Sequence, residues 1–397
     1  MDALSNPYTP GAGTKPPALT GRDEQLGHFE LLLGRLERGR PERSMLITGL
    51  RGVGKTVLLT TFEDMALGRG WFPALSEIRH DTELRPLIAR MSRRVLLAMS
   101  RAERVRDRAR RALGVLKAFS VRTPEGFELS IDVDALTGTA DSGDLEEDLS
   151  ELLVELGQAA KDAGSGVIFL LDEIQFLDQR SLEALISALH RIAQRELPLA
   201  LVGGGLPSIP RLAGEAKSYA ERLFTFPRIG SLSEAAATEA LILPAREEAV
   251  EYEGAAVERI LELSEAYPYF LQEYGRHVWQ VATQSPIGAE DVERAHPTVQ
   301  SDLDEGFFTV RFERATAAER RYMAAMAALG DGPQESGQVA RRLGFADTAK
   351  TSVIRSNLID KGLIFSPEYG VVDFTVPHFA EFMRRNFPLD AEERSDP

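Results

Sequence analysis

The stretch MLITGLRGVGKT at residues 45–56 joins a short apolar run to the pattern G-x-x-x-x-G-K-T. The run Met45–Ile47 is typical of a buried strand, and the apolar residues Val57–Leu59 after Thr56 are typical of the start of a helix. Glycines in such a loop let successive N–H groups point toward one anion, and the helix N-terminus adds its positive dipole end. The stretch therefore predicts a phosphate-binding loop after the first strand of an α/β core.

Individual roles follow from the way such loops hold a triphosphate. The ammonium of Lys55 is expected to contact the β- and γ-phosphates of ATP, and the hydroxyl of Thr56 is expected to hold Mg²⁺. A glycine-rich turn that matches by chance is the alternative, but the strand–loop–helix context argues against it. The residues expected to surround the nucleotide phosphates are Leu50, Arg51, Gly52, Val53, Gly54, Lys55, Thr56 and Val57.

A second motif lies 116 residues after Thr56. The five apolar residues Val167–Leu171 show no alternation, as expected of a parallel strand covered on both faces, and they end in Asp172-Glu173. Carboxylates at the carboxyl end of such a strand lie beside the phosphate loop. We therefore expect Asp172 to hold Mg²⁺, mostly through water, and Glu173 to polarise the attacking water.

Composition limits the class of protein. The 397 residues carry a net charge of −15 and no cysteine, which excludes disulfides and thiolate metal sites and argues against a surface that binds nucleic acid everywhere. No apolar run is long enough to span a membrane, and no secretory segment opens the chain. Residues 1–18 are rich in Pro, Gly and Thr and are expected to be a disordered tail, and we expect a cytoplasmic protein.

The charge is unevenly distributed. Residues 83–117 hold eleven Arg and Lys against three acids, whereas residues 122–155 hold eleven acids and only Arg122. The two segments neutralise each other, or the arginines form a solvated helix face, or they contact the phosphate backbone of DNA. The sequence leaves these alternatives open.

The intervening chain alternates strands and helices. Strands are predicted near residues 72–78, 198–202 and 223–226, and a two-strand excursion is predicted at 119–121 and 127–133. This pattern indicates an α/β fold, a parallel P-loop sheet between helices. The predicted domains are the core at 19–229, a helical lid at 230–305 and a winged helix at 315–387.

The winged helix has two possible uses. Its predicted third helix, Thr348–Lys361, has Val353 and Leu358 on the side expected to be buried. A charge of about +1 over 315–387 does not decide between reading duplex DNA and contacting protein. The apolar phrase Phe374–Phe379 is able to dock against the body of the protein. Accessible positions for a DNA contact are Lys350, Ser352, Arg355, Ser356 and Asn357.

Taken together, these motifs over residues 18–387 resemble the AAA+/STAND group of P-loop ATPases, and within it prokaryotic AAA family ATPases similar to archaeal origin-binding initiators. Gly21, Arg22 and Glu24 match a G-R-x-x-E segment that flanks adenine in that group. In the lid, Pro268 matches a residue near adenine. The resemblance implies that Arg222, which precedes the last core strand, is an arginine finger for a neighbouring subunit, or else a surface ion-pair residue.

The chain departs from that group at two places. The fourth strand ends in Gly203-Gly204-Gly205 where a polar sensor residue is usual, and Tyr269 stands where the lid carries an arginine. Both departures favour slow hydrolysis, and Arg276 is a weak candidate to replace the missing arginine. We expect an ATP-dependent switch that controls its winged helix; the alternative is a DNA-binding initiator-like or transposition-helper ATPase, and a homo-oligomer is compatible with both.

Overall fold

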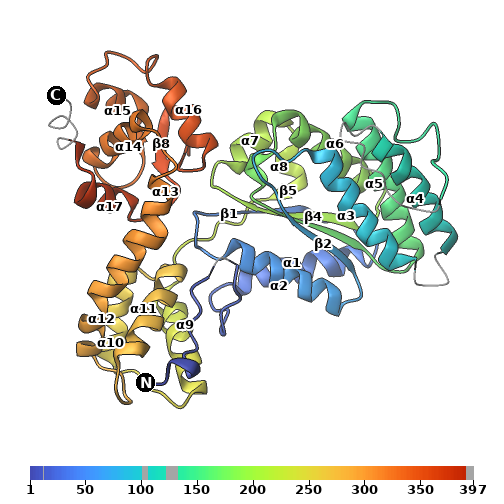
Figure 1. The fold of residues 1–397 in the computed structure, drawn as a ribbon. Coiled ribbons are helices and arrows are strands. Elements are labelled where there is room, and N and C mark those ends of the chain that lie inside the picture. Colours follow the sequence, from blue (N-terminus) through green and yellow to red (C-terminus); the bar gives the residue numbers. More distant parts are fainter. Residues whose placement is uncertain (12, 101–105, 122–132, 390–397) are drawn as a thin grey trace.

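Five parallel strands form the central sheet in the order β2-β3-β4-β1-β5 (Figure 1). The structure is a computed structural model, and it describes residues 1–11, 13–100, 106–121 and 133–389. Strand β1 lies between β4 and the edge strand β5, so the loop that follows β1 opens at the carboxyl edge of the sheet, one strand in from β5. The strands are β1 (Ser44–Thr48), β2 (Phe72–Glu77), β3 (Val167–Asp172), β4 (Leu199–Gly205) and β5 (Phe224–Thr225).

Helices cover both faces of this sheet. Successive residues of β3 belong to different apolar cores: Ile168 and Leu170 pack with Phe29 and Phe62, whereas Phe169 packs on the opposite face. A strand buried on both faces needs apolar residues at every position, which explains the unbroken run in the sequence. One face carries α1 (Asp23–Leu36) and α2 (Lys55–Gly68); beyond the other lie α3 (Leu84–Met99), α4 (Arg106–Val121), α5 (Leu145–Asp162), α6 (Gln179–Gln194), α7 (Ile209–Ala216) and α8 (Ala220–Leu223).

The strand predicted at residues 119–121 is wrong, because these residues end helix α4. Ala112, Leu116 and Phe119 are buried at helical spacing, so the apolar stripe of α4 continues through the segment. The partner segment predicted at 127–133 lies, except for Val133, outside the described residues.

The second lobe begins with four helices around the buried Trp279, at the lower left of Figure 1. A π-helical segment η4 (Leu303–Thr309) and the short helix α13 (Val310–Phe312) then lead to the C-terminal module, and we call residues 303–312 the connector. The four helices are α9 (Glu234–Glu247), α10 (Gly254–Ser264), α11 (Pro268–Val281) and α12 (Ala289–Asp302).

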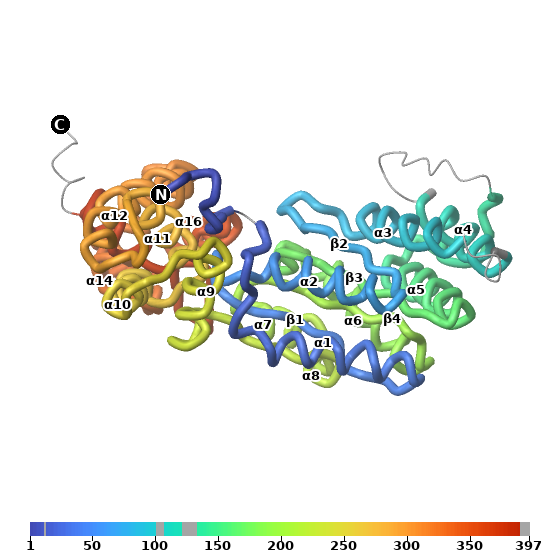
Figure 2. Tube along the Cα trace, turned by 90° about the horizontal axis from the view of Figure 1, so that it is seen from below, coloured from blue at the N-terminus to red at the C-terminus, as the bar shows by residue number. Residues whose placement is uncertain are grey.

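The expectation of a disordered tail over 1–18 stays a prediction, but several described N-terminal residues make specific contacts with the four-helix lobe. Tyr8 is only 3% exposed, and its hydroxyl donates a 2.5 Å hydrogen bond to the carbonyl of Leu241. The indole of Trp279 donates to the carbonyl of Asp2 at 2.9 Å. The segment lies along the four-helix lobe and then crosses toward the core (Figure 2). Burial of the Tyr8 ring and these two hydrogen bonds favour the docked position of the segment.

The C-terminal module combines helices with a three-stranded antiparallel sheet in the order β6-β8-β7, an arrangement consistent with a winged helix. Leu358 is buried as expected, but Val353 is 67% exposed, because the helix begins at Ser352 and turns Val353 outward. The elements are α14 (Ala317–Leu329), β6 (Gln334–Glu335), α15 (Ser336–Arg342), α16 (Ser352–Asp360), β7 (Ile364–Phe365), β8 (Val371–Phe374) and α17 (Phe379–Asn386).

One apolar core joins these parts. It includes Phe62 of the central domain, Phe307 and Phe308 of the connector, and Phe374 and Phe382 of the C-terminal module. Within the part of the chain that is described, no helix has the length and hydropathy needed to cross a membrane.

Candidate functional site

The glycine-rich loop follows β1 and leads directly into α2. Gly52 and Gly54 have φ values of +89° and +92°, a backbone region that residues with a side chain rarely adopt. A Cβ at Gly52 would also lie 3.1 Å from the ring of Tyr267 in the lid. The loop conformation therefore requires glycine at position 52 both for its backbone angles and for its close approach to the lid.

Lys55 is buried at the centre of the loop. Its ammonium donates to the carbonyls of Gly49 at 2.9 Å and Leu50 at 2.8 Å. Burial lowers the pKa of Lys55, while the nearby carboxylates of Glu173 and Asp172 oppose that shift. A buried cation that is satisfied only by carbonyl oxygens is ready to exchange them for an anion.

The two residues expected to hold Mg²⁺ lie together. The Thr56 hydroxyl donates a 2.5 Å hydrogen bond to Oδ2 of Asp172, at the carboxyl end of β3. Burial raises the pKa of Asp172, and the hydrogen bond from Thr56 opposes that shift. One hydroxyl and one carboxylate at the mouth of a phosphate loop fit a cation that takes its remaining oxygens from water and phosphate.

Glu173 is held by two neighbours. Its carboxylate lies 3.8 Å from the guanidinium of Arg51 and accepts a hydrogen bond from the amide of Gln175, a residue of the short helix η3 (Ile174–Phe176). The side-chain oxygen Oε1 of Gln175 in turn accepts a hydrogen bond from the backbone N–H of Leu206 at 3.2 Å. Sequence reasoning missed Gln175, for which the only signal is its position two residues after Glu173.

The cavity beside the loop has a volume of about 530 Å³, within the range of small-ligand sites. It brings together most of the residues selected from the sequence. Several N-terminal residues, among them Thr9 and Thr20, also contribute to its wall, and Gly13 packs against the side chain of Thr56. Predicted residues that line the cavity are Arg22, Arg51, Gly52, Val53, Gly54, Lys55, Thr56, Val57, Glu173 and Pro268.

The G-R-x-x-E segment borders this cavity. The Arg22 guanidinium donates to the carbonyls of Val53 at 3.1 Å and Gly230 at 2.8 Å, and burial lowers its pKa. Gly21 has a φ of +64°, and a Cβ there would lie 2.7 Å from that of Ala236. Arg22 thus connects the phosphate loop to the start of the lid.

Arg51 contacts the core, the lid and the C-terminal module. Its N–H donates to the carbonyl of Thr375 in the C-terminal module at 3.0 Å, and its carbonyl accepts a hydrogen bond from the Tyr267 hydroxyl. Its side chain reaches Glu173 and packs against Gly362, next to β7. The apolar segment at residues 374–379 therefore contacts the phosphate loop itself.

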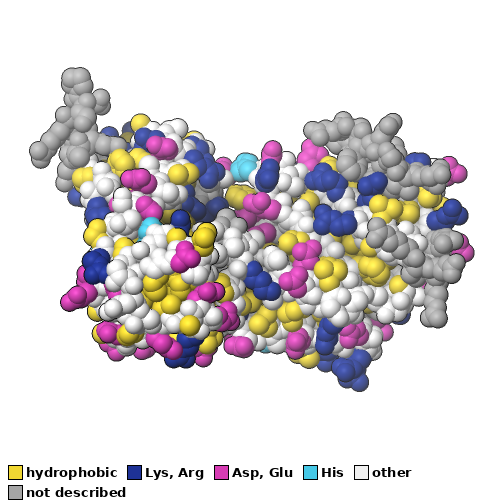
Figure 3. Space-filling model, turned by 60° about the horizontal axis from the view of Figure 1, so that its bottom comes forward, with side chains coloured by type: hydrophobic (Ala, Val, Ile, Leu, Met, Phe, Trp, Pro, Cys, Tyr) yellow, Lys and Arg dark blue, Asp and Glu magenta, His cyan; other side chains and the backbone are white. Residues whose placement is uncertain are grey.

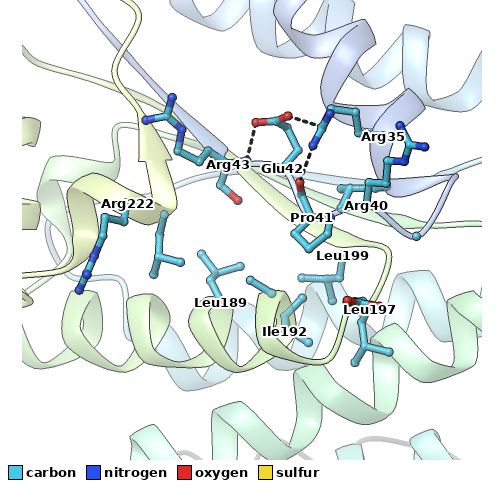
Figure 4. A pocket seen from close by; sticks show the side chains of 16 residues that line it. Arg35, Arg40, Pro41, Glu42, Arg43, Leu189, Ile192, Leu197, Leu199 and Arg222 are labelled. Carbon is cyan, nitrogen blue, oxygen red and sulfur yellow. Dashed lines mark hydrogen bonds and ion pairs between the residues drawn. The ribbon is translucent and has the colours of Figure 1, made fainter.

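Arg222 lies apart from this site. Residue Phe224 pairs with Ser44 at the start of β1, and the phosphate loop begins after Thr48, about 13 Å farther along the strand. The Arg222 side chain lies at the rim of a second cavity, on the opposite side from Arg40 (Figure 4). Arg276 is exposed on α11 and is not among the residues that line the nucleotide cavity.

The predicted DNA contacts differ in accessibility. Lys350 is exposed, but Arg355 is half-buried and donates to the hydroxyl of Ser336 at 3.3 Å. In the arginine-rich segment, Arg85 pairs with Asp148 at 2.8 Å, and Arg108 and Arg111 pair with acids of α5. Part of the segment is therefore neutralised by the acidic stretch that follows it; Arg101 and Arg104 lie outside the described residues.

Comparisons with known proteins agree with this geometry. Residues 18–202 match the family model of the AAA ATPase domain, and residues 305–383 match a domain of unknown function (DUF8462). The Walker-type ATPase PABY2304 of Pyrococcus abyssi has a similar fold, with a TM-score of 0.54, 18% identity, and coverage of 94% of this chain and 97% of that one. No curated protein matches the chain.

Two further structures have lower scores. The Aeropyrum pernix Orc1 protein, solved in complex with DNA, gives a TM-score of 0.43 at 18% identity, with 95% of each chain covered. The Thermotoga maritima RuvB Holliday junction branch migration motor gives 0.46 at 17% identity, with 91% of this chain and 96% of that one covered.

Proposed function

We propose that the protein binds ATP with Mg²⁺, hydrolyses it slowly, and acts as a nucleotide-dependent switch; the match of residues 18–202 to the AAA ATPase domain supports this proposal. In this proposal the core at 19–229, the lid at 230–305 and the winged helix at 315–387 change their mutual contacts with the nucleotide state. The observation that carries the proposal is the hydrogen bond from the Arg51 N–H to the Thr375 carbonyl. This hydrogen bond connects the phosphate loop directly to the C-terminal module, and it engages a backbone amide of the loop.

The chain's own groups suggest how ATP is handled. Lys55 would exchange the carbonyls of Gly49 and Leu50 for phosphate oxygens, and the loop amides would surround the phosphates. Bound Mg²⁺, next to Thr56 and Asp172, would neutralise charge on the phosphate oxygens. Glu173 would orient water once its carboxylate leaves Arg51 and Gln175.

Slow turnover is proposed for a structural reason. The end of β4 carries three glycines, and the Gln175 side chain occupies the space over Gly205. Glu173 is engaged by Arg51 and Gln175, so breaking these contacts precedes any activation of water. An enzyme limited by such a step spends most of its time bound to ATP, as a switch requires.

The test uses the full chain. ATP affinity is measured by calorimetry with Mg²⁺, and phosphate release is followed over several turnovers. Lys55→Ala is expected to abolish both, whereas Lys15→Ala, an exposed lysine near the same cavity, is expected to retain both. The proposal fails if Lys55→Ala binds ATP like the parent protein.

The switch itself is tested by hydrogen exchange. ATP, held on a slowly hydrolysing Glu173→Gln variant, is expected to change exchange in residues 45–56 and 362–376 relative to ADP. If hydrogen exchange is unchanged in both segments although ATP is bound, the proposed switch is contradicted while the ATPase activity is not.

A DNA-binding role is the second candidate. Within the described residues, Arg90, Arg93, Arg94 and Arg110 have no ion pair, and Lys350 is exposed. On the face drawn in Figure 3, however, Lys and Arg side chains form separate groups among acidic ones. Retardation of duplex DNA at low salt, weakened by Lys350→Ala but not by the exposed Lys161→Ala, would favour this role.

Arg222 is proposed to act on a neighbouring copy in a homo-oligomer, because its position excludes its own phosphate loop. The measurement is phosphate release as a function of protein concentration. A rate per molecule that rises with concentration in the parent, but not in Arg222→Ala, is expected; a concentration-independent rate argues against the oligomer.

A further inference from the structure

A cation that the sequence analysis did not select lines the nucleotide cavity. Arg311 belongs to α13 in the connector, and it shares the cavity wall with Arg51, Lys55 and Phe307. Its guanidinium lies 4.1 Å from the centroid of the Phe307 ring and donates to the Phe307 carbonyl. Phe307 is itself stacked on Tyr269, with 4.6 Å between ring centroids. The stack holds the guanidinium in place before any ligand is bound.

The charge of Arg311 differs from that of Arg51 in its surroundings. In the part of the chain that the structure describes, no Asp or Glu lies within ion-pair distance of its guanidinium, whereas Arg51 has Glu173. The pKa of Arg311 is lowered to about 10, mainly by burial and also by the positive charge of Arg51. Two guanidinium groups that face one cavity and repel each other favour an anion between them.

The cavity residues indicate which part of a nucleotide would lie there. Arg22, Leu232 and Ala240 line the wall near the G-R-x-x-E segment, which is expected to border adenine. Arg51 pairs with Glu173, the group expected to orient the attacking water, and the charge of Arg51 acts on Arg311. The terminal phosphate, where water attacks, therefore belongs at the Arg311 end.

We propose that Arg311, together with Arg51, binds the terminal phosphate of ATP and so makes the connector sense whether that phosphate is present. This inference rests on the proposed function and adds a residue to it. ADP lacks the phosphate that Arg311 would contact, so only ATP would draw the connector toward the loop. Because the connector leads directly into α14, the position of the C-terminal module would follow.

The experiment compares ATP and ADP affinities, with Mg²⁺, for the full chain and its variants. Arg311→Met keeps an apolar stem over Phe307 and removes the charge. It is expected to weaken ATP binding by about 10- to 100-fold, as for a hydrogen bond to a charged group, and ADP binding by less than threefold. Arg314→Ala, which removes a nearby exposed arginine outside the cavity wall, is the matched control.

Thermal unfolding without nucleotide separates binding from structure. If Arg311 binds phosphate, Arg311→Met unfolds at the same temperature as the parent or higher, because an unpaired buried charge has been removed. Equal loss of ATP and ADP affinity, or no loss of either, overturns the inference. If Lys55→Ala abolishes ATP binding while Arg311→Met does not discriminate, only this inference fails; if Lys55→Ala binds normally, the proposed function fails as well.

Discussion

At the scale of single residues, Glu173 is the group whose surroundings bear most directly on chemistry. It has a φ of +54°, in the left-handed region, and its carboxylate is held by Arg51 and Gln175. Backbone strain of this kind is maintained only where the surrounding structure enforces it. The same arrangement keeps the carboxylate close to the cavity, and in the proposed function its partners would have to move before it could act on water.

Glu173→Gln is therefore expected to reduce phosphate release by about 100- to 10,000-fold while ATP binding stays within a few-fold of the parent. The amide keeps the shape of the side chain but does not accept a proton from water. Single-turnover hydrolysis and calorimetric ATP binding measure the two effects. Glu247→Gln, at an exposed lid position, is the control, and a parent-like rate in Glu173→Gln would remove this residue from the reaction.

Asp373 in β8 predicts a pH dependence. Burial raises its pKa to about 6, and its carboxylate accepts only the Phe374 N–H among the contacts found in the described chain. The pKa in the unfolded chain is near 3.9. Well below pH 4 both states are protonated. Between about pH 4 and 6 the unfolded chain releases this proton while the folded state retains it, so stability falls over that range and stays lower above it.

Asp373→Asn is expected to unfold at a higher temperature than the parent at pH 7–8 and at the same temperature near pH 3. The gain is about 1 kcal/mol, allowing for the solvent that reaches this half-buried side chain. Thermal unfolding across the pH range measures it, with the exposed Asp360→Asn as control. A difference that is the same at both pH values would contradict the pKa argument.

At the scale of elements, the end of β4 shows how the sheet controls the site. A Cβ at Gly205 would lie 2.3 Å from Oε1 of Gln175, and a Cβ at Gly203 would lie 2.7 Å from Cδ2 of Leu46. Gly205 thus leaves the space that the Gln175 side chain occupies, whereas Gly203 allows the close approach of Leu46. The end of β4 carries no polar side chain, and the polar side chain at this place is that of Gln175 on η3.

Gly205→Ala is expected to destabilise the protein by about 1–3 kcal/mol through overpacking, and to change phosphate release because Gln175 must move. Gly214→Ala, in helix α7 with open space around the added carbon, is expected to stabilise by about 0.5–1 kcal/mol. Chemical denaturation measures both. The explanation is wrong if the two substitutions have the same sign.

At the scale of the whole molecule, the nucleotide cavity is assembled from parts far apart in the chain. The N-terminal segment, the phosphate loop, helix α11 and the connector all contribute to its wall. Tyr8 fixes the N-terminal segment, since its ring packs against Gly275 and its hydroxyl bonds to Leu241. Detachment of this segment would open the cavity without altering the loop.

Tyr8→Ala removes packing worth about 3–5 kcal/mol, enough to release the segment from the lid. Bound nucleotide is then expected to dissociate at least about tenfold faster, equivalent to ~1.4 kcal/mol. Stopped-flow displacement of a fluorescent ATP analogue measures the rate. Tyr369→Ala, at a position that is fully exposed, is the control, and equal rates for both variants would show that the segment is not part of the site.

The sequence by itself determined the phosphate loop, the paired acids after β3 and the parallel α/β core, because local spacing encodes backbone geometry and strand burial. Only the tertiary structure decided that Asp2 and Tyr8 contact the four-helix lobe, that 119–121 continue a helix, and that Arg311, Gln175 and Thr375 lie at the loop. Arg311 and Thr375 are more than 250 positions from the phosphate loop, and packing between such distant residues leaves no periodic signal in the sequence. Gln175 is only two residues from Glu173, but its hydrogen bonds depend on the neighbouring strand β4.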